Sequence, residues 1–397
     1  MSFILIIGII MAIVALTYRA AENPGVSGNN KKKNPLFLLL LAIALGALVG
    51  GLVWLFLKVM GEGIDLIWEI LPGKLDFAFY PIVVCGLGGL AVGFCQKKYS
   101  GYPETLETVI EKFKKDGGYE YKRLHGLILC ALLPLLFGGS IGPEAGLSGI
   151  IAGLCSWIGA HFKDVEKKSK KRVFYMVSAL TGAGCCYIMT EYLGGGMHIS
   201  RFDGSLPALG DLLWFIPLAL IGIAAGAIYF ASGKLVDLIL KPVARYIVIR
   251  AVIGGVVLGI FGMFFAYTMF SGEEEMGEIM ADWAAIPAMT LFFYGVLKLV
   301  MINICIKSGW RGGHIFPLIF AGICLGYAMA ALTGIEGVFA TAVTTAALCG
   351  AVMGQPPVVA ALLLLCYPVV NVLFLFAAAF VGAKAGKLFK FLKLGTE

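Results

Sequence analysis

Residues 138–149 read GGSIGPEAGLSG, which places glycines, a proline and a carboxylate inside an otherwise apolar stretch. Glycines free the backbone from helical geometry and let it approach a ligand closely, and Pro143 suits the first position of a helix, where a missing N–H costs nothing. A helix that begins there directs unpaired N–H groups and about half a positive charge forward. Because an unpaired N–H is costly in hydrocarbon, the segment predicts a site filled by an anion, water or a carboxylate.

Two other segments repeat this chemistry. GGHIFP at 312–317 combines two glycines with Pro317, and SGYP at 100–103 combines the hydroxyl donor of Ser100 with Pro103. Both prolines are predicted helix starts, like Pro143. The three donor clusters come with no metal-ligand set and no catalytic-triad spacing, so they predict an anion pathway that needs no cofactor and no metal.

A membrane-embedded enzyme is the main alternative from another class, and the residue spacing argues against it. The four histidines show no HExxH spacing, and the sequence has no paired intramembrane acids and no serine-nucleophile setting. A receptor or scaffold is a further alternative, which the glycine-rich segments disfavour because irregular backbone at membrane depth is tolerated only around a cavity or inside protein. For His314 two interpretations stay open: its imidazole faces the anion, or it packs beside the turn.

The elements that hold these segments are expected to be membrane helices. Of 397 residues, 60% are hydrophobic and 14% are charged, which is typical of an integral membrane protein. The apolar runs 35–57, 173–193, 212–231 and 287–306 are each long enough, at about 20 residues, to cross a bilayer as a helix. The N-terminal residues 1–19 lack a basic n-region and a cleavage site, so we expect an accessory spanning helix there.

The distribution of charge predicts the orientation of the chain in the membrane. Cations gather in the segments 96–124 and 161–172 and in the tail 384–393, whereas 58–77, 194–211 and 271–283 together hold three cations and eleven acidic side chains. By the positive-inside rule the basic segments are cytoplasmic, so the C-terminus is expected on the cytoplasmic side of the cell membrane. The lysines lack the pattern of a nucleic-acid surface. The acidic segment GEEEMGEIMAD is expected to be a solvated face.

Four sequence similarities in the same order relate the two halves of the chain. Residues 41–58, 81–94, 99–110 and 138–146 resemble 218–234, 252–265, 270–280 and 312–322. The charge pattern puts corresponding loops on opposite sides, so the halves are inverted, and inverted halves predict a midplane site built from interrupted helices. We expect an all-α inverted-repeat bundle of tilted and discontinuous helices: 1–35 as accessory helix and linker, 36–211 as the first repeat, 212–397 as the second, and no cytoplasmic regulatory domain.

These motifs resemble those of the CLC family of chloride channels and chloride/proton antiporters over roughly residues 36 to 390. YSGYPE is similar to that family's GSGIPE, GGSIGPE to its GREGP, and GGHIFP to its GxFxP. The resemblance implies a CLC-like fold, chloride or a similar small anion as the substrate, and a homodimer in a lipid bilayer with one pathway in each subunit.

The resemblance also implies roles for single residues. The hydroxyl of Ser100 would donate to the anion, the backbone N–H groups of His314 and Ile315 would cradle it, and those of Ser140, Ile141 and Gly142 would line an outer site. Gly139, Gly313 and Phe316 complete the expected anion-binding set.

The sequence departs from the family pattern at the gate and along the proton route. The family's gating glutamate corresponds to Ile141, and Glu144 follows three residues later. Glu144 is either a movable anion mimic or a dipole-stabilised glutamate of the first helical turn. No counterpart of the family's inner proton glutamate or central tyrosine is found, and Tyr367 is only the nearest tyrosine by position. These losses favour a passive chloride channel, with a chloride/proton antiporter gated by Glu144 as the alternative.

Overall fold

The computed structural model describes residues 35–75, 77–116, 119–120, 122–161, 168–195, 199–204 and 207–391. The accessory helix expected within residues 1–34 lies outside the described residues. The chain divides into two compact units, which are treated separately below. The first is formed by Met1–Asp65, Glu107–Leu124 and Leu147–Gly196, and the second by Leu66–Leu106, His125–Gly146 and Met197–Glu397.

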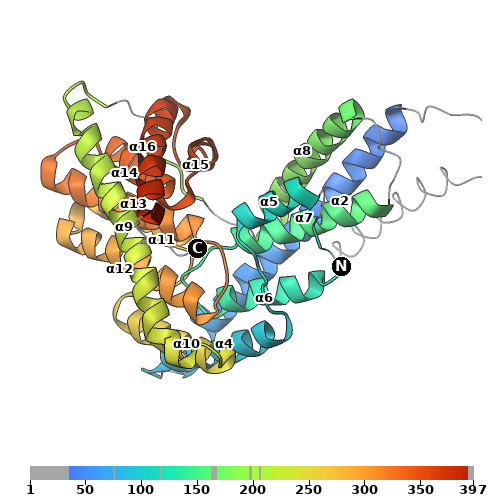
Figure 1. Ribbon diagram of the computed structural model, residues 1–397, viewed down its shortest axis with the longest axis horizontal. Coiled ribbons are helices and arrows are strands. Elements are labelled where there is room, and N and C mark those ends of the chain that lie inside the picture. The colour runs from blue at the N-terminus through green and yellow to red at the C-terminus, as the bar shows by residue number, and fades with distance from the viewer. Residues whose placement is uncertain are drawn as a thin grey trace, which may run out of the picture. The chain divides into compact units, whose positions relative to one another are not determined.

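The first unit is centred on two long helices, α2 (Pro35–Asp65) and α8 (Lys168–Leu193), which lie side by side (Figure 1). A Cβ atom on Gly46 would lie 2.3 Å from the carbonyl oxygen of Ser178, so the two backbones touch there. Small residues allow this close packing where lipid provides no hydrophobic drive. The unit also contains most of α5 (Leu106–Asp116) and most of α7 (Glu144–His161).

The second unit holds the remaining helices. In chain order these are η1 (Leu66–Ile70), α3 (Pro72–Leu75), α4 (Tyr80–Lys98), α6 (Leu124–Leu136), η2 (Asp211–Trp214), α9 (Phe215–Leu240), η3 (Lys241–Val243), α10 (Ile247–Phe264), η4 (Ala266–Thr268), α11 (Glu273–Asp282), η5 (Trp283–Ala285), α12 (Ala288–Ser308), α13 (Ile315–Thr333), α14 (Gly337–Met353), α15 (Pro356–Leu363), η6 (Val369–Asn371) and α16 (Val372–Phe391).

The core of the second unit is built around α13 and α14. Phe320 and Phe339 are fully buried in it. A Cβ on Gly326 would lie 2.4 Å from the Cα of Thr341, so these two helices also approach backbone to backbone. Because protein interiors are close-packed and resist deformation, this core fixes the start of α13, where GGHIFP lies.

The helices α4 and α10 pack antiparallel beside that core (Figure 1). A Cβ on Gly93 would meet Val248 at 2.7 Å, and one on Gly259, near the other end of α10, would meet Ile82 at 2.6 Å. Residues 81–94 and 252–265, which resemble each other in sequence, therefore lie in direct contact. The loop that contains Ser100 follows α4, and residues 265–272 follow α10.

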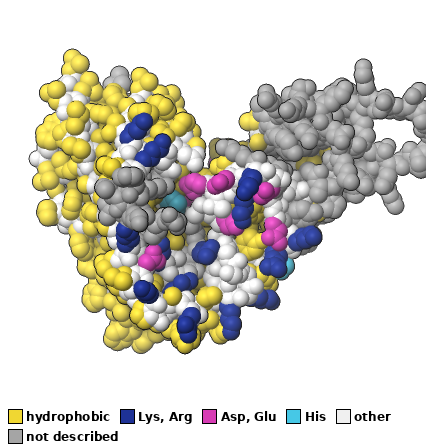
Figure 2. Space-filling model, viewed as in Figure 1, with side chains coloured by type: hydrophobic (Ala, Val, Ile, Leu, Met, Phe, Trp, Pro, Cys, Tyr) yellow, Lys and Arg dark blue, Asp and Glu magenta, His cyan; other side chains and the backbone are white. Residues whose placement is uncertain are grey.

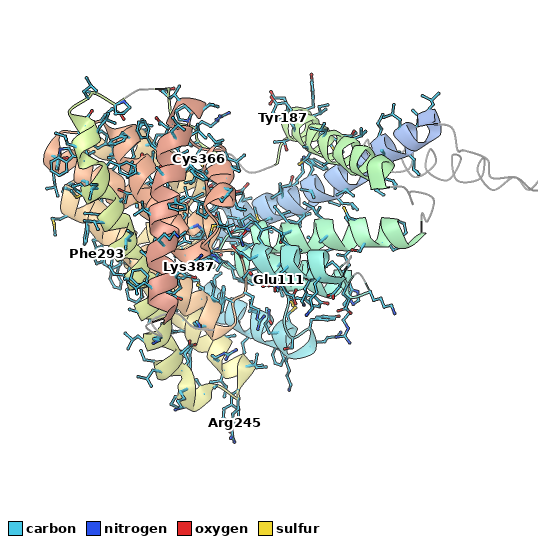
Figure 3. All side chains as sticks on the ribbon, turned by 45° about the horizontal axis from the view of Figure 1, so that its top comes forward. Glu111, Tyr187, Arg245, Phe293, Cys366 and Lys387 are labelled. Atoms are coloured by element: carbon cyan, nitrogen blue, oxygen red, sulfur yellow. The ribbon has the colours of Figure 1, made fainter. Side chains whose placement is uncertain are left out.

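The described residues confirm an all-α protein that crosses the membrane several times. Seven helices are long and apolar enough to span a bilayer: Leu39–Lys74, Tyr80–Lys98, Asp211–Val243, Ile247–Phe264, Ala288–Ser308, Ile315–Thr333 and Val369–Phe389. Large apolar side chains such as Ile216, Leu220 and Leu238 are exposed along α9, and Figure 2 shows hydrophobic side chains spread over this part of the surface. Phe293 on α12 is likewise exposed (Figure 3). Such faces suit lipid.

The expected helix start at Pro103 is wrong. The helix begins at Leu106, and residues 102–105 precede it without helical structure. The side-chain amide of Gln96 donates to the carbonyl of Tyr102 at 2.6 Å, and the guanidinium of Arg311 donates to the carbonyl of Gly101 at 3.0 Å. These carbonyls are therefore directed at side chains rather than at amides one helical turn further on.

Candidate functional site

The two glycine-rich loops of the second unit pair with each other. The N–H of Gly142 donates to the carbonyl of Gly313, and the N–H of Gly313 donates to the carbonyl of Gly142, both at 2.8 Å. This reciprocal pair forms a short antiparallel bridge. The loops come from segments far apart in the sequence, and the bridge holds the starts of two helices, α7 and α13, next to each other.

Both helices begin where the glycines end. The first residue of α7 is Glu144, directly after Pro143, and α13 begins at Ile315, so that Pro317 is its third residue. Neither proline interrupts a helical hydrogen bond, because the first-turn N–H groups have no partner inside the helix. The prolines therefore leave the helix starts intact while the loops turn sharply ahead of them.

The carboxylate of Glu144 lies on the start of the other helix. Its Oε1 accepts a hydrogen bond from the backbone N–H of Ile315 at 2.6 Å, across 171 residues of sequence. The bond is short, as charge-assisted hydrogen bonds are. It also places a negative charge at the positive end of α13, where anions are stabilised. A carboxylate oxygen thus stands where a bound anion would contact the Ile315 N–H.

The glycines on either side leave room for this carboxylate. A Cβ on Gly313 would lie 1.9 Å from the Cδ of Glu144, and one on Gly142 would lie 2.0 Å from its Oε2. No side chain fits at either position without moving the carboxylate. The site is therefore a narrow space between two bare backbone segments, suited to a group of few atoms.

The amides expected to line an outer site are used within the protein. The N–H of Ile141 donates to the carbonyl of Gly139, that of Gly142 donates to Gly313, and the N–H of Ser140 faces the thiol of Cys305. Of these three, only the Gly142 N–H takes part in the pairing of the two loops, and the role of the amides at an outer anion site stays a prediction. At the position of the family's gating glutamate, Ile141 is fully buried, and its side chain fills the space beside Gly312.

Ser100 lies in a loop that is tied to the same region. Its side chain is exposed at the end of α4, and the next residue, Gly101, accepts the hydrogen bond from Arg311, which precedes the second glycine loop. The connection runs through the backbone of Gly101.

The remaining predicted residues of the second loop have packing contacts. The ring of His314 lies 6.3 Å from that of Tyr229 on α9, and Phe316 packs against the buried core. These contacts favour the interpretation that His314 packs beside the turn. Tyr367 is fully buried, with its ring stacked on Phe202 at 4.4 Å and its hydroxyl 3.3 Å from that of Thr345.

The expectation of a solvated acidic face is wrong for Glu273. This first residue of α11 has only 6% of its surface exposed, and Met276 and Ile279 on the same helix are buried as well. Burial raises the pKa of Glu273 well above its ordinary value, and the nearby charge of Glu144 raises the pKa further. A spacing of three residues along a helix marks one face, so the sequence carried a signal for this buried face.

A buried lysine beside α11 was also not predicted from the sequence. Lys298 on α12 is fully buried, and its ammonium donates to the carbonyls of Tyr267, Met269 and Phe270 at 3.1, 2.6 and 2.9 Å. These bonds use all three donors of the ammonium group. A lone lysine inside an apolar span is itself a signal of function.

Among the described residues, no group of three or more His, Cys, Asp or Glu side chains could hold a metal ion.

Comparisons with known proteins show the family of this chain. The family described as voltage gated chloride channel matches residues 170–387, more than half of the chain. Proteins named putative ion-transport protein YfeO from Escherichia fergusonii and from an Escherichia coli strain are each 25% identical to the chain, over 75% of its length and 79% of theirs.

Solved structures share the fold. A CLC-type fluoride/proton antiporter superposes with a TM-score of 0.65 at 18% identity, covering 91% of this chain and 98% of its own. A slow cyanobacterial Cl⁻/H⁺ antiporter superposes with a TM-score of 0.66 at 17% identity, covering 90% and 98%. Because the family model matches more than half of the chain, the chain belongs to the voltage-gated chloride channel (CLC) family, whose members transport anions.

Proposed function

We propose that this protein exchanges a small anion, chloride in the first place, for protons across the cell membrane, with Glu144 as its gate. The observation that carries the proposal is the hydrogen bond from the Ile315 N–H to the Glu144 carboxylate. The carboxylate occupies the position that a transported anion needs. Anion and carboxylate therefore compete for one helix start.

Protonation decides that competition. A carboxylate holds the Ile315 N–H through a charge-assisted bond and through the dipole of α13. A protonated Glu144 has lost the charge on which both terms depend, so a free anion displaces it. Anion binding at the Ile315 N–H is then linked to proton uptake by Glu144, and this linkage couples the two fluxes.

The space around Glu144 supports a small anion as the substrate. Gly142 and Gly313 both approach the carboxylate closely, so an anion that replaces it must also be small. Chloride fits this description, and fluoride fits it as well. The positive-inside pattern supports a cytoplasmic C-terminus, and pairing of two copies stays a prediction from the family resemblance.

A passive anion channel is the second candidate. It is favoured by Ile141, a buried apolar residue at the position of the family's gating glutamate, and by the lack of a sequence counterpart for the inner proton glutamate. In such a channel Glu144 would be a fixed structural ligand of Ile315. Anion flow would then need no proton movement.

Flux measurements separate the two candidates. The purified protein is reconstituted in chloride-loaded liposomes, and chloride and proton movements are followed under opposed chloride and pH gradients. In an exchanger, chloride flow down its gradient drives protons uphill in the opposite direction. Replacing Glu144 with Gln keeps the size of the side chain but removes its charge and proton, so we expect proton movement to fall at least about a hundredfold while chloride flux continues.

The control variant is Glu111→Gln, which makes the same change at an exposed position on α5 (Figure 3). It is expected to behave as the wild type. Chloride efflux without uphill proton movement in the wild type would favour the channel, and unchanged fluxes in the Glu144→Gln variant would exclude Glu144 as the gate.

A further inference from the structure

A second carboxyl group lies beside the gate. Glu273 begins α11, is almost fully buried, and its Oε1 accepts no hydrogen bond from the described residues. A carboxylate buried with an oxygen lacking a donor is costly, whereas a protonated carboxyl is far less so. The position of Glu273 therefore favours a group that holds a proton.

The loops that carry the two carboxyl groups are bonded to each other. The N–H of Phe270 donates to the carbonyl of Gly138 at 3.1 Å, and a Cβ on Gly138 would lie 2.5 Å from the side chain of Met269. The segment before Glu273 thus packs directly on the loop before Glu144. The charge of Glu144 acts on Glu273, as expected for neighbouring carboxyl groups.

The groups that face Glu273 come from several elements. The acidic neighbours are Glu144 on α7 and Glu274 and Glu275 on α11, the hydroxyl of Ser271 and the thiol of Cys366 lie nearby, and Lys298 on α12 is the cation that acts on it. Lys298 is fully buried. Its charge offsets part of the cost when Glu273 gives up its proton.

We infer that Glu273 is a second proton-holding residue of the anion site, which passes its proton to Glu144 and so opens the gate. This inference rests on the proposed function. In the step, the O–H bond of Glu273 breaks and an O–H bond forms on Glu144, while the electron pair of the broken bond stays on Glu273 as a carboxylate. Glu144 then releases the Ile315 N–H to an anion, and the Glu273 carboxylate takes up a proton from a hydronium ion of the bulk solution, which becomes water.

The test compares Glu273→Gln with Asp282→Asn in the liposome assay, with the pH changed on one side at a time. Asp282 is the last residue of the same helix and is exposed, so its replacement makes the same charge change away from Glu273. We expect Glu273→Gln to lower proton flux at least about tenfold, as for loss of a positioned proton donor, and to flatten the pH dependence of chloride flux. The Asp282→Asn variant is expected to match the wild type.

The outcomes separate this inference from the proposed function. If Glu144→Gln abolishes proton flux and Glu273→Gln leaves it unchanged, Glu273 is not part of the route and only the inference fails. If the wild type moves no protons, both proposals fail. If Glu273→Gln lowers proton and chloride flux equally, its role is structural, and the inference is overturned.

A second measurement does not depend on transport. Infrared spectra of the reconstituted protein are expected to show a protonated carboxyl band at neutral pH that is lost in Glu273→Gln. The variant Glu273→Asp, which keeps a carboxyl group on a shorter side chain, covers the case in which the glutamine variant does not fold, and it is expected to shift the band. A spectrum unchanged by either substitution would overturn the inference.

Discussion

Two glutamates at helix starts illustrate two uses of the same residue. Glu336 precedes α14 and accepts hydrogen bonds from the N–H groups of Val338 and Phe339 at 3.0 and 2.6 Å, two and three residues along its own chain. Glu144 begins α7, but its carboxylate accepts from Ile315 at the start of α13. Glu336 caps the helix that it precedes, and Glu144 occupies the start of a different helix.

The difference lies in what can replace each carboxylate. The cap at Glu336 is local, so its donors and acceptor move together and no ligand competes for them. At Glu144 the donor and the acceptor belong to separate helices, which are joined by the bridge between Gly142 and Gly313. In the proposed exchanger, a free anion takes the place of the carboxylate without unwinding either helix.

The largest effect on anion flux is expected from filling the space beside the Glu144 carboxylate. In Gly313→Ala, the new Cβ would lie 1.9 Å from the Cδ of Glu144, so the carboxylate must leave and an anion meets the same obstacle. We expect anion flux in liposomes to fall at least about tenfold, equal to ~1.4 kcal/mol in anion binding. In the control Gly61→Ala on α2, a Cβ would have open space, and flux is expected to stay at the wild-type level. Wild-type flux in Gly313→Ala would contradict a site at this position.

A smaller effect is expected from Glu273, a third glutamate at a helix start. Its pKa is raised by burial, so the folded state keeps a proton that the unfolded state releases near pH 4.3, roughly the ordinary value for glutamate. The folded state then binds more protons, and stability falls as pH rises from there to the folded pKa, by up to about 1.4 kcal/mol per pH unit.

Unfolding in detergent over a series of pH values measures this slope. The slope is expected to decrease in Glu273→Gln and to stay unchanged in Asp282→Asn. A remaining slope is expected from Glu275, whose pKa is also raised by burial. If removal of Glu273 left the slope as in the wild type, the raised pKa would be wrong.

The smallest effect is expected at Glu336. Replacing this N-cap with Ala removes the acceptor for two amides and should lower the free energy of unfolding by about 1 kcal/mol. Transport per folded protein should not change, because no substrate competes for this cap. Loss of proton coupling in Glu336→Ala would remove the distinction between the two glutamates.

Much of the fold could be predicted from residue patterns. Long apolar runs such as 212–231 and 287–306 correspond to α9 and α12, and the prolines 356, 357 and 368 separate α14, α15 and α16. These features are local, since the length of an apolar run and the conformational limits of proline act over a few residues. The helix start at Pro103 failed because the bonds from Gln96 and Arg311 to the loop come from outside it.

The site was only partly predictable for the same reason. The glycines and prolines of 138–143 and 312–317 indicated two helix starts directed at an anion. In the structure, the amides of Gly142 and Gly313 instead donate to each other's carbonyls. Nothing next to Glu144 in the sequence distinguishes a first-turn glutamate from a gate. Lys298 and Glu273 were each visible as a charge in an unusual setting, yet their burial depends on the helices around them.

The sequence by itself determined that this chain is a multi-pass helical membrane protein with glycine-bounded helix starts, because hydropathy, glycine freedom and proline geometry act locally along the chain. Only the tertiary structure decided which backbone N–H donates to the Glu144 carboxylate and which acidic side chains are buried. Those outcomes depend on backbone segments 171 residues apart that meet through close packing, and no local pattern encodes that distance.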